Sequence, residues 1–431
     1  MIQISSLSLI DRIEVKGSYC KVVINSEFKS RYLLDDFWYT QEGCDLEALP
    51  NYILLIPFIL NIAPIVWISG DEFWLDEMDS DLCDALQKMK AALMNMYPNV
   101  LWAGELLVKE KLKFEPVSVD NIACALFSGG LDSFSTSFSH LNQKQILVTV
   151  RGSDVKLDDD IGWANVKKAV SEYSGTFDSE VCFIESNFTS FLNYRMLNNL
   201  TPDIRSWWTL VQHGMGLAGF MAIPGRIHGA STGYIASSHS YEFSDQPWAS
   251  CPEIDDNIKW SGFKVQHDGF EYTRQGKVGV VVNAVKKESL IRPNLRVCYI
   301  SSGGKNCSRC EKCLRTMAGL VVAGENYSSY GFDLPVDEFV GSLKAMFSKA
   351  RSTFHSNTLF HWKDIQKHIS LTSAYNNGPI EDFLHWLKVF DFDVYYRRSA
   401  RIFSRKSMIK RFLKGVPGIY GVYVLIKKYV S

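Results

Sequence analysis

The segment that most constrains the fold lies between residues 122 and 141, where an apolar run, a glycine turn and an amphipathic run follow one another. Residues 122–127 (IACALF) have the length and apolarity of a buried parallel strand. Residues 134–141 carry apolar side chains at roughly helical spacing. A strand that passes through a tight turn into a helix predicts an α/β fold.

The turn itself, SGGLDS at residues 128–133, has the composition of a loop that binds phosphate. Gly129 and Gly130 allow positive φ and let backbone N–H groups approach an anion. The following helix adds its first N–H groups and a partial positive charge. Ser128 and Ser133 can donate to phosphate oxygens, and Asp132 can hold a magnesium ion. These groups suit a pyrophosphate, and the alternative is a Ser/Gly-rich turn without a ligand.

Strands and helices continue to alternate beyond this turn. Apolar runs at 145–151 and 180–186 predict strands, and helices are expected at 161–173 and 206–223. This order predicts a doubly wound parallel sheet that binds ligands at the carboxyl ends of its strands. The chain has no Walker A pattern, so transfer of a γ-phosphoryl group is the less favoured chemistry.

Two regions flank the central domain, which we expect at residues 118–330. Residues 1–117 combine strand-like segments with a helical stretch at 80–96 and predict an α+β accessory domain. Residues 331–431 predict a helical region, and its last 35 residues hold ten Lys or Arg and no acidic residue. That asymmetry predicts an acidic partner, such as nucleic acid, an anionic membrane surface or an acidic protein, with a solvated helix face as the alternative.

An apolar segment at residues 49–70 resembles a membrane span only in composition. Pro57, Asn61 and Pro64 interrupt it and leave pieces too short to cross about 30 Å of hydrocarbon as one regular helix. We therefore expect two buried strands, or a strand and a turn, and no membrane partner.

Composition constrains the number of domains, the partners and the compartment only loosely. A chain of 431 residues is long enough for two or three domains, and its net charge of −1 gives no global attraction for nucleic acid. The first residues lack the basic start and apolar core of a signal peptide. Ten cysteines, six of them without a pairing pattern, favour a reducing compartment over a disulfide scaffold. We therefore expect a cytoplasmic protein.

Four cysteines are spaced as metal ligands in the pattern C-x8-C-x2-C-x2-C: Cys298, Cys307, Cys310 and Cys313. Two-residue gaps let neighbouring thiolates meet at one tetrahedral ion, and residues 301–304 (SSGG) supply the turn back to the first cysteine. Nearby cations would offset the negative charge of four thiolates. A closed structural zinc site is the favoured prediction. An iron–sulfur cluster and unconnected cysteines in a loop are the alternatives.

The SGGLDS turn resembles the SGGxDS signature of the PP-loop ATP pyrophosphatases, whose fold is that of the HUP-like adenine nucleotide α-hydrolases. The resemblance implies that the loop binds the β,γ-diphosphate of ATP together with Mg²⁺ and that AMP passes to a substrate oxygen. The signature is shared by many ligases and names a reaction type rather than a substrate. The implied ATP-binding residues are Ser128, Gly129, Gly130, Leu131, Asp132 and Ser133.

With the cysteine pattern about 165 residues later, the chain resembles the QueC family of 7-cyano-7-deazaguanine synthases. The resemblance implies an AMP-forming ligase that adenylates a 7-deazaguanine carboxylate for attack by ammonia, and a structural Zn²⁺ site. Residues 273–278 (TRQGKV) are similar to a Ser-Lys segment of the family. That similarity implies that Lys277 and Arg274 act beside Asp132 on ATP phosphate or on the substrate carboxylate.

Residues 206–223 and 235–269 depart from the QueC pattern, so the substrate wall differs. His213, His239 and Asp256 are the candidate substrate contacts there, and for each the alternative is an ordinary core or loop residue. The long chain and altered wall resemble the enlarged QueC-like proteins of bacterial anti-phage operons, most closely the QatC proteins of the Qat defence system. This implies other proteins of the same operon as partners and an amine on one of them as a possible acceptor.

Three functions follow from these observations. The favoured one is a QueC-like ligase that acts on a deazaguanine-type carboxylate in anti-phage defence. The second is a PP-loop enzyme that modifies nucleic acid, which the basic C-terminal segment supports. The third is an ATP-binding scaffold component of a defence complex.

Overall fold

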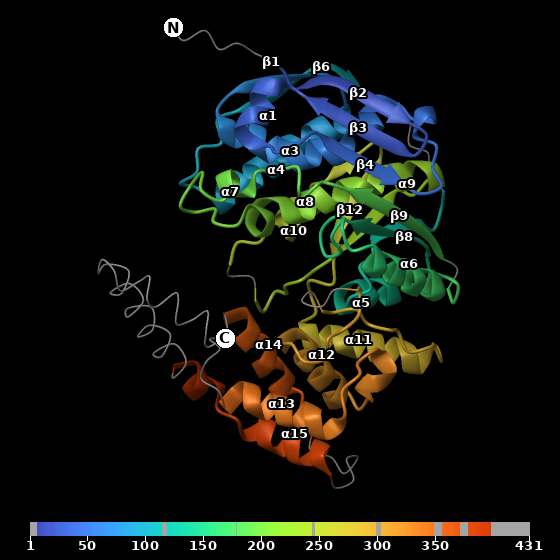
Figure 1. Cartoon of the computed structure of the whole chain (residues 1–431), viewed down its shortest axis with the longest axis vertical. Helices are drawn as coiled ribbons and strands as arrows, with labels where there is room; N and C mark the ends of the chain where they lie inside the picture. The colour runs from blue at the N-terminus through green and yellow to red at the C-terminus, as the bar shows by residue number, and fades with distance from the viewer. Residues whose placement is uncertain are drawn as a thin grey trace, which may run out of the picture. The chain divides into compact units, whose positions relative to one another are not determined.

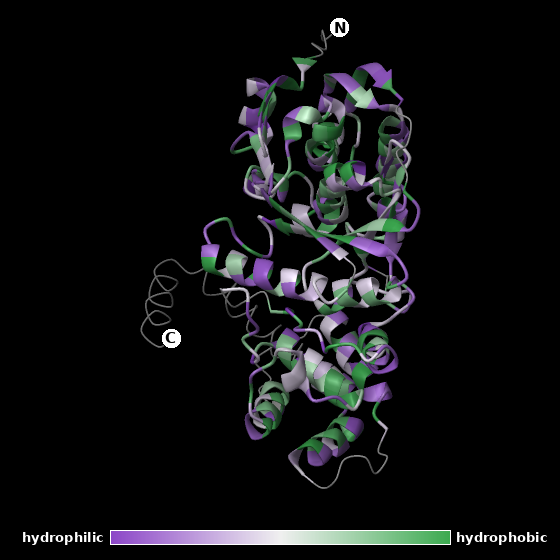
Figure 2. Ribbon diagram, turned by 90° about the vertical axis from the view of Figure 1, so that its right-hand side faces the viewer, coloured by the Kyte–Doolittle hydropathy of each residue, from purple (hydrophilic) through white to green (hydrophobic). Residues whose placement is uncertain are grey.

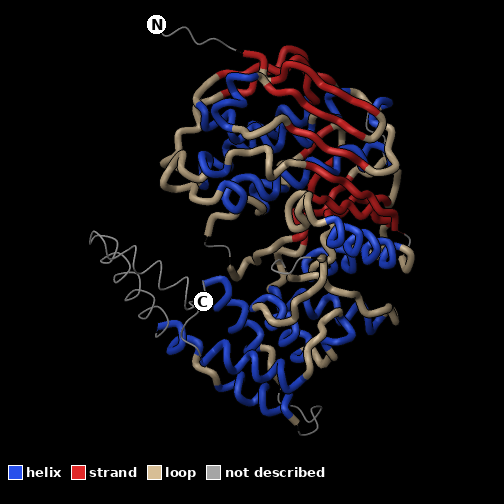
Figure 3. The backbone as a smooth tube through the Cα atoms, in the orientation of Figure 1, coloured by secondary structure: helices blue, strands red, loops and turns tan. Residues whose placement is uncertain are grey.

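The computed structural model describes residues 7–113, 119–177, 179–243, 246–298, 303–348, 356–370 and 378–397. The chain divides into two compact units (Figure 1). The first comprises residues 1–307 with 329–331, and the second comprises residues 308–328 and 332–431. Strands belong to the first unit, while the described part of the second unit is helical (Figure 3).

A mixed sheet of nine strands is the larger of two sheets in the described part of the first unit. Its five central strands run parallel, and the four flanking strands pair antiparallel with their neighbours. The prediction of a parallel sheet is therefore confirmed for the centre, within a mixed α/β architecture. In sheet order the strands are β11 (Lys259–Trp260), β12 (Phe263–Asp268), β10 (Thr232–Ala236), β7 (Ile122–Leu126), β8 (Lys144–Arg151), β9 (Ser179–Ser186), β4 (Phe37–Gln41), β3 (Tyr19–Ile24) and β2 (Ile10–Lys16).

The order of the parallel strands reverses at β7. The chain passes from β7 to β8 and β9 on one side, then returns to place β10 and β12 on the other side of β7. Where strand order reverses, the loops after the two diverging strands leave a crevice at their carboxyl ends. The SGGLDS turn follows β7 and therefore lies at this crevice.

The predicted elements around the turn are confirmed. The turn leads into α5 (Leu131–Ser139), β8 and β9 occupy the predicted strands, and α6 (Asp160–Ser174) joins them. The predicted helix at 206–223 is confirmed as a continuous helical stretch, which changes its winding from a π-helix (Trp208–Gln212) to α8 (His213–Ala218), a 3₁₀ turn (Gly219–Met221) and α9 (Ala222–His228). Glycines recur here because α3 packs closely against this stretch: a Cβ on Gly219 would lie 2.9 Å from the Pro57 Cα, and one on Gly216 would lie 2.5 Å from the Asn61 side-chain oxygen.

The prediction of strands at residues 49–70 is wrong. This segment forms α2 (Asn51–Leu54) and α3 (Ile56–Ser69), and α3 is buried from Ile56 to Trp67. Pro57 lies in the first turn, where a missing N–H costs nothing, but Pro64 lies inside the helix. Burial of apolar side chains on every side stabilises the helix against this local penalty, and Figure 2 shows green, hydrophobic helices inside the unit. Among the described residues, no helix is long and apolar enough to cross a membrane.

The N-terminal region shares its core with the parallel strands. β4 pairs with β9, and the ring of Phe37 lies 5.2 Å from that of Phe191. A second, parallel sheet consists of β1 (Leu7–Ser8), β5 (Glu72–Asp79) and β6 (Glu105–Leu112). The predicted helix at 80–96 is α4 (Ser80–Met96). The boundary expected at residue 117 falls inside the first compact unit, and that domain division stays a prediction.

The second unit is a helical body, as the sequence predicts. Aromatic side chains form its core: Phe347 lies 5.0 Å from Trp362, and Phe339 lies 5.6 Å from Phe383. Residues 398–431, with nine of the ten basic residues noted above, lie outside the described residues. Its helices are α12 (Glu311–Val322), α13 (Val336–Ser348), α14 (Ser356–Lys367) and α15 (Pro379–Val389).

A buried amide network joins α3 to the π-helix. Asn61 Nδ2 donates to the carbonyl oxygens of Pro57 (2.8 Å) and Gly216 (3.1 Å). Gln212 Nε2 donates to Asn61 Oδ1 at 2.6 Å and to the carbonyl oxygen of Phe188 at 2.9 Å. The network satisfies polar groups that burial would otherwise leave unpaired.

Replacing Gln212 with Leu is expected to lower the free energy of unfolding by about 1–3 kcal/mol, because buried oxygens of Asn61 and Phe188 lose their donor. Urea unfolding measures the difference. Gln266→Leu, at an exposed position of β12, is the control and should stay within about 0.5 kcal/mol of the wild type. Equal stabilities for Gln212→Leu and the wild type would contradict the role of the network.

Candidate functional site

The SGGLDS turn is held in a conformation that its glycines permit. Gly129 has φ +71°, a left-handed value that favours glycine. Ser128 Oγ accepts from the N–H of Gly130 at 3.3 Å, and Ser133 Oγ donates to the Gly130 carbonyl oxygen at 3.0 Å. The two serines therefore stabilise the turn at the point where α5 begins.

Two cations from α11 (Arg274–Lys287) meet the carboxylate of Asp132. Arg274 Nη1 lies 3.1 Å from Asp132 Oδ2, and Lys277 Nζ lies 3.6 Å from Asp132 Oδ1. Thr273 caps α11 by accepting from the N–H of Gly276 at 3.1 Å. The structure thus brings together the three residues that the sequence resemblance names as catalytic.

Lys277 is almost entirely buried, with 2% of its surface exposed. Its Nζ donates to the carbonyl oxygen of Ser237, immediately after β10. Burial lowers the pKa of Lys277, and the nearby Asp132 carboxylate opposes that shift. Arg274, Lys277 and the N-terminus of α5 supply positive charge here, and the carboxylates of Asp132 and Asp268 oppose it. An added anion would interact favourably with the two cations and the helix N-terminus.

Asp132 alone is a poor site for a magnesium ion. Its carboxylate already faces Arg274 and Lys277, and a divalent ion beside it would be repelled by both. Magnesium in nucleotide sites is held largely by substrate phosphates and by one or two carboxylates. The magnesium role of Asp132 stays a prediction.

Arg296 is a contact that the sequence reasoning missed. Its Nε donates to the Ser128 carbonyl oxygen at 2.9 Å, and its backbone N–H donates to the Gly129 carbonyl oxygen at 2.6 Å. Burial lowers the pKa of this guanidinium group. The only sequence signal was a basic residue two positions before Cys298, and nothing in its spacing points to a loop about 168 residues earlier.

The three candidate substrate contacts differ in position. His239 follows β10 and lies near Lys277, whose positive charge lowers its pKa in addition to the larger effect of burial. The ring of His213 lies 5.5 Å from that of Trp248, which in turn lies 5.0 Å from the ring of His239. Asp256 instead accepts from the backbone N–H of His267 at 2.7 Å, and burial raises its pKa.

The neighbouring Asp255 is the more deeply buried of the two aspartates. Its Oδ2 lies 2.8 Å from His267 Nδ1 and accepts from Ser250 Oγ at 2.6 Å. The Asp255 and His267 side chains are fully buried. This pair orders the chain after β10, and a sequence signal existed only in the two consecutive aspartates.

Four cysteines form a cluster that could bind a metal ion such as zinc. Their sulfur atoms all lie within 4.8 Å of one another: Cys298, Cys307, Cys310 and Cys313. Gly303 and Gly304 have positive φ values of 81° and 69°, consistent with the predicted turn. A set of four thiolates fits zinc in a closed tetrahedral site, which has no open position for a substrate and is therefore structural. ATP and magnesium have no comparable support.

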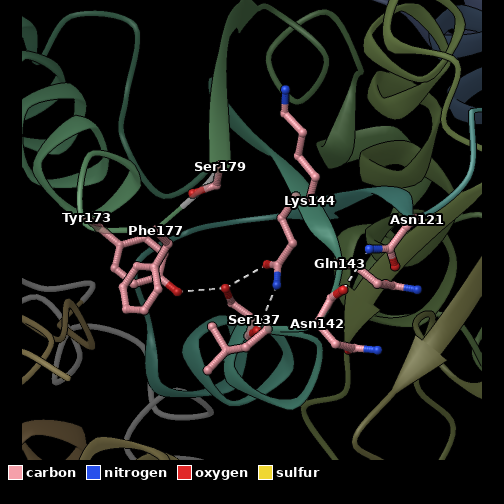
Figure 4. Close-up of a pocket in the computed structure, with 10 residues that line it drawn as sticks. Asn121, Ser137, Asn142, Gln143, Lys144, Tyr173, Phe177 and Ser179 are labelled. Atoms are coloured by element: carbon pink, nitrogen blue, oxygen red, sulfur yellow. Dashed lines mark hydrogen bonds between the residues drawn. The ribbon is translucent and has the colours of Figure 1, made fainter. Parts of the chain in front are cut away.

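A small pocket of about 200 Å³ lies at the amino ends of the central strands, whereas the SGGLDS turn lies at their carboxyl ends (Figure 4). Ser137 Oγ donates to Gln145 Oε1 at 2.7 Å and lies 2.7 Å from the Tyr173 hydroxyl. Asn121 and Ser179 line the same pocket. The side chains of Ser137, Gln145 and Tyr173 are hydrogen-bonded to one another, and the pocket is separate from the turn after β7.

No protein-family model, curated protein or solved structure matches this chain.

Purified protein is expected to hold about one zinc ion per chain, measured by elemental analysis. Cys310→Ser leaves three sulfur ligands and should lower both the zinc content and the thermal midpoint. Cys44→Ser, a partly buried cysteine outside the cluster, is the matched control and should retain zinc. Iron with labile sulfide in place of zinc would favour the iron–sulfur alternative.

The lowered pKa of His239 predicts a pH effect on stability. Unfolded histidine has a pKa of about 6.5, so protons bind the unfolded chain first as the pH falls. The stabilisation from neutral His239 is present above that value and is lost as the pH falls through the folded pKa. Chemical unfolding between about pH 8 and pH 5 should show a steeper loss for the wild type than for His239→Asn. Parallel curves would contradict this.

Proposed function

We propose that the chain is an ATP-dependent, AMP-forming ligase of the QueC-like type, with a doubly wound PP-loop domain. In this proposal a 7-deazaguanine-type carboxylate is activated as an acyl-adenylate and then attacked by ammonia or by an amine of a partner protein. The resemblance to QatC proteins motivates a role in anti-phage defence, in the cytoplasm, together with proteins of the same operon.

The observation that carries the proposal is the meeting of Asp132, Arg274 and Lys277 beside the turn after β7. A glycine turn, a helix N-terminus and two cations are the groups that stabilise a diphosphate as it leaves. They lie where the strand order reverses, which is the usual ligand site of open α/β sheets. The cysteine cluster adds the second motif of the QueC resemblance.

The proposed reaction has two steps. A carboxylate oxygen of the substrate attacks the α-phosphorus of ATP, the bond to the β-phosphate oxygen breaks, and diphosphate leaves. The amine then attacks the activated carbonyl carbon, AMP leaves, and the amine loses a proton as the C–N bond forms. In this scheme Arg274 and Lys277 neutralise phosphate charge, while Asp132 orients both cations.

The protein with ATP, magnesium and 7-carboxy-7-deazaguanine is expected to form AMP and diphosphate. Lys277→Gln removes a buried charge aimed at the loop and should reduce the rate at least about 100-fold. Lys264→Gln, at an exposed position of β12, is the matched control. Mass spectrometry of the reaction, with and without the proteins encoded beside this one, identifies the products.

An adduct on a neighbouring protein would establish a conjugating ligase. Free nitrile would establish a synthase of the QueC type, in which a second ATP adenylates the amide oxygen and AMP carries that oxygen away as the nitrile forms. Absence of AMP and of any adduct in the wild type would contradict the proposal. Nucleic-acid binding that weakens steeply with salt would then favour the second function considered from the sequence.

A further inference from the structure

A cavity of about 930 Å³ lies in the first unit between α4 and the chain that follows β10. Lys88, Ala91 and Asn95 line it from α4, and His239 and Trp248 line it from the other side. Its volume is near the upper end of the range for small-molecule sites, about 300–1,000 Å³. The cavity is therefore large enough for a heteroaromatic ring and for a second reactant beside it.

Hydrogen bonds connect Lys277 through Ser237 to His239, which lines the cavity. Lys277 Nζ donates to the carbonyl oxygen of Ser237, and Ser237 Oγ donates to the carbonyl oxygen of His239 at 2.7 Å. His239 lines the cavity and interacts electrostatically with both Lys277 and Asp132. A ligand in this cavity would therefore lie next to the groups proposed to bind ATP phosphate.

Aromatic rings line the wall of the cavity that contains His239. The His239 ring lies 5.0 Å from that of Trp248, and the Tyr241 ring lies 4.6 Å from that of Phe270. Tyr241 is 71% exposed although it belongs to this lining. Exposed aromatic faces beside a cavity are suited to stack against a flat ring.

Among the described residues, the cavity lining has one cation, Lys88, and one carboxylate, Glu253, so the further positive charge available to an acid lies outside the lining. Lys88 is an exposed cation of the α4 wall, and Arg274 and Lys277 lie beyond His239. Burial keeps His239 neutral at pH 7, so the imidazole can donate a hydrogen bond to a carboxylate without adding charge. Glu253, on the opposite wall, can accept a hydrogen bond from a ring N–H group.

We infer that this cavity binds the acid substrate, a planar heteroaromatic carboxylic acid. Its ring lies against Trp248 and Phe270, and its carboxylate points past His239 toward Lys277. The inference rests on the proposed function and deepens it. It assigns one wall of the substrate site to α4, in the N-terminal region outside the stretch that resembles QueC.

The test is calorimetric titration of the full chain with 7-carboxy-7-deazaguanine and, separately, with ATP. Ala91→Trp fills the cavity from an exposed position of α4 and should weaken acid binding at least about tenfold while ATP binding changes less than about twofold. Gln87→Trp places the same side chain on an exposed position of α4 outside the lining and should change neither. Trp248→Leu, which removes a stacking ring, should also weaken acid binding.

The outcomes separate the two proposals. Acid binding that is unchanged in both Ala91→Trp and Trp248→Leu would overturn the cavity assignment and leave the ligase proposal standing. A wild type that binds ATP but not the acid would overturn the assignment and the deazaguanine substrate together. Selective loss of acid binding in the two variants, with Gln87→Trp unaffected, is the expected result.

Discussion

The burial of Lys277 is the constraint on which the candidate site depends. An ammonium group removed from water needs a charge partner and hydrogen-bond acceptors, and Lys277 finds them in Asp132 and in the carbonyl oxygen of Ser237. These partners belong to α5 and to the chain after β10, so one buried charge joins three segments. Because β7 and β10 are neighbouring strands at the reversal of strand order, the joined segments surround one crevice.

The same arrangement connects two chemical environments. On one side, Arg274 and Lys277 lie beside the turn and can attract an anion such as phosphate. On the other side, His239 leads into a cavity lined by aromatic rings and by α4. A reaction that joins an aromatic acid to a nucleotide requires both environments within one substrate length. This adjacency connects the proposed function with the proposed substrate site.

Local patterns predicted local structure well. The apolar run at 122–127, the glycines after it and the helical spacing beyond correspond to β7, the turn and α5, because each depends on neighbouring residues. Prediction failed where packing outweighed propensity. The interrupted apolar run at 49–70 forms α3 around Pro64 because burial on all sides stabilises it. The helix expected at 206–223 does form, but its spacing did not predict the π-helical and 3₁₀ turns, which lie where its glycines pack closely against α3.

The sequence by itself determined the phosphate-loop composition, the cysteine spacing and the alternation of strands and helices, because these are set over short stretches of chain. Only the tertiary structure decided that Arg296 holds the turn, that antiparallel strands flank the parallel centre, and that α4 faces His239 across a cavity. Each of these three features joins residues that are far apart in the sequence. Their proximity follows from the packing of whole elements, which no local pattern encodes.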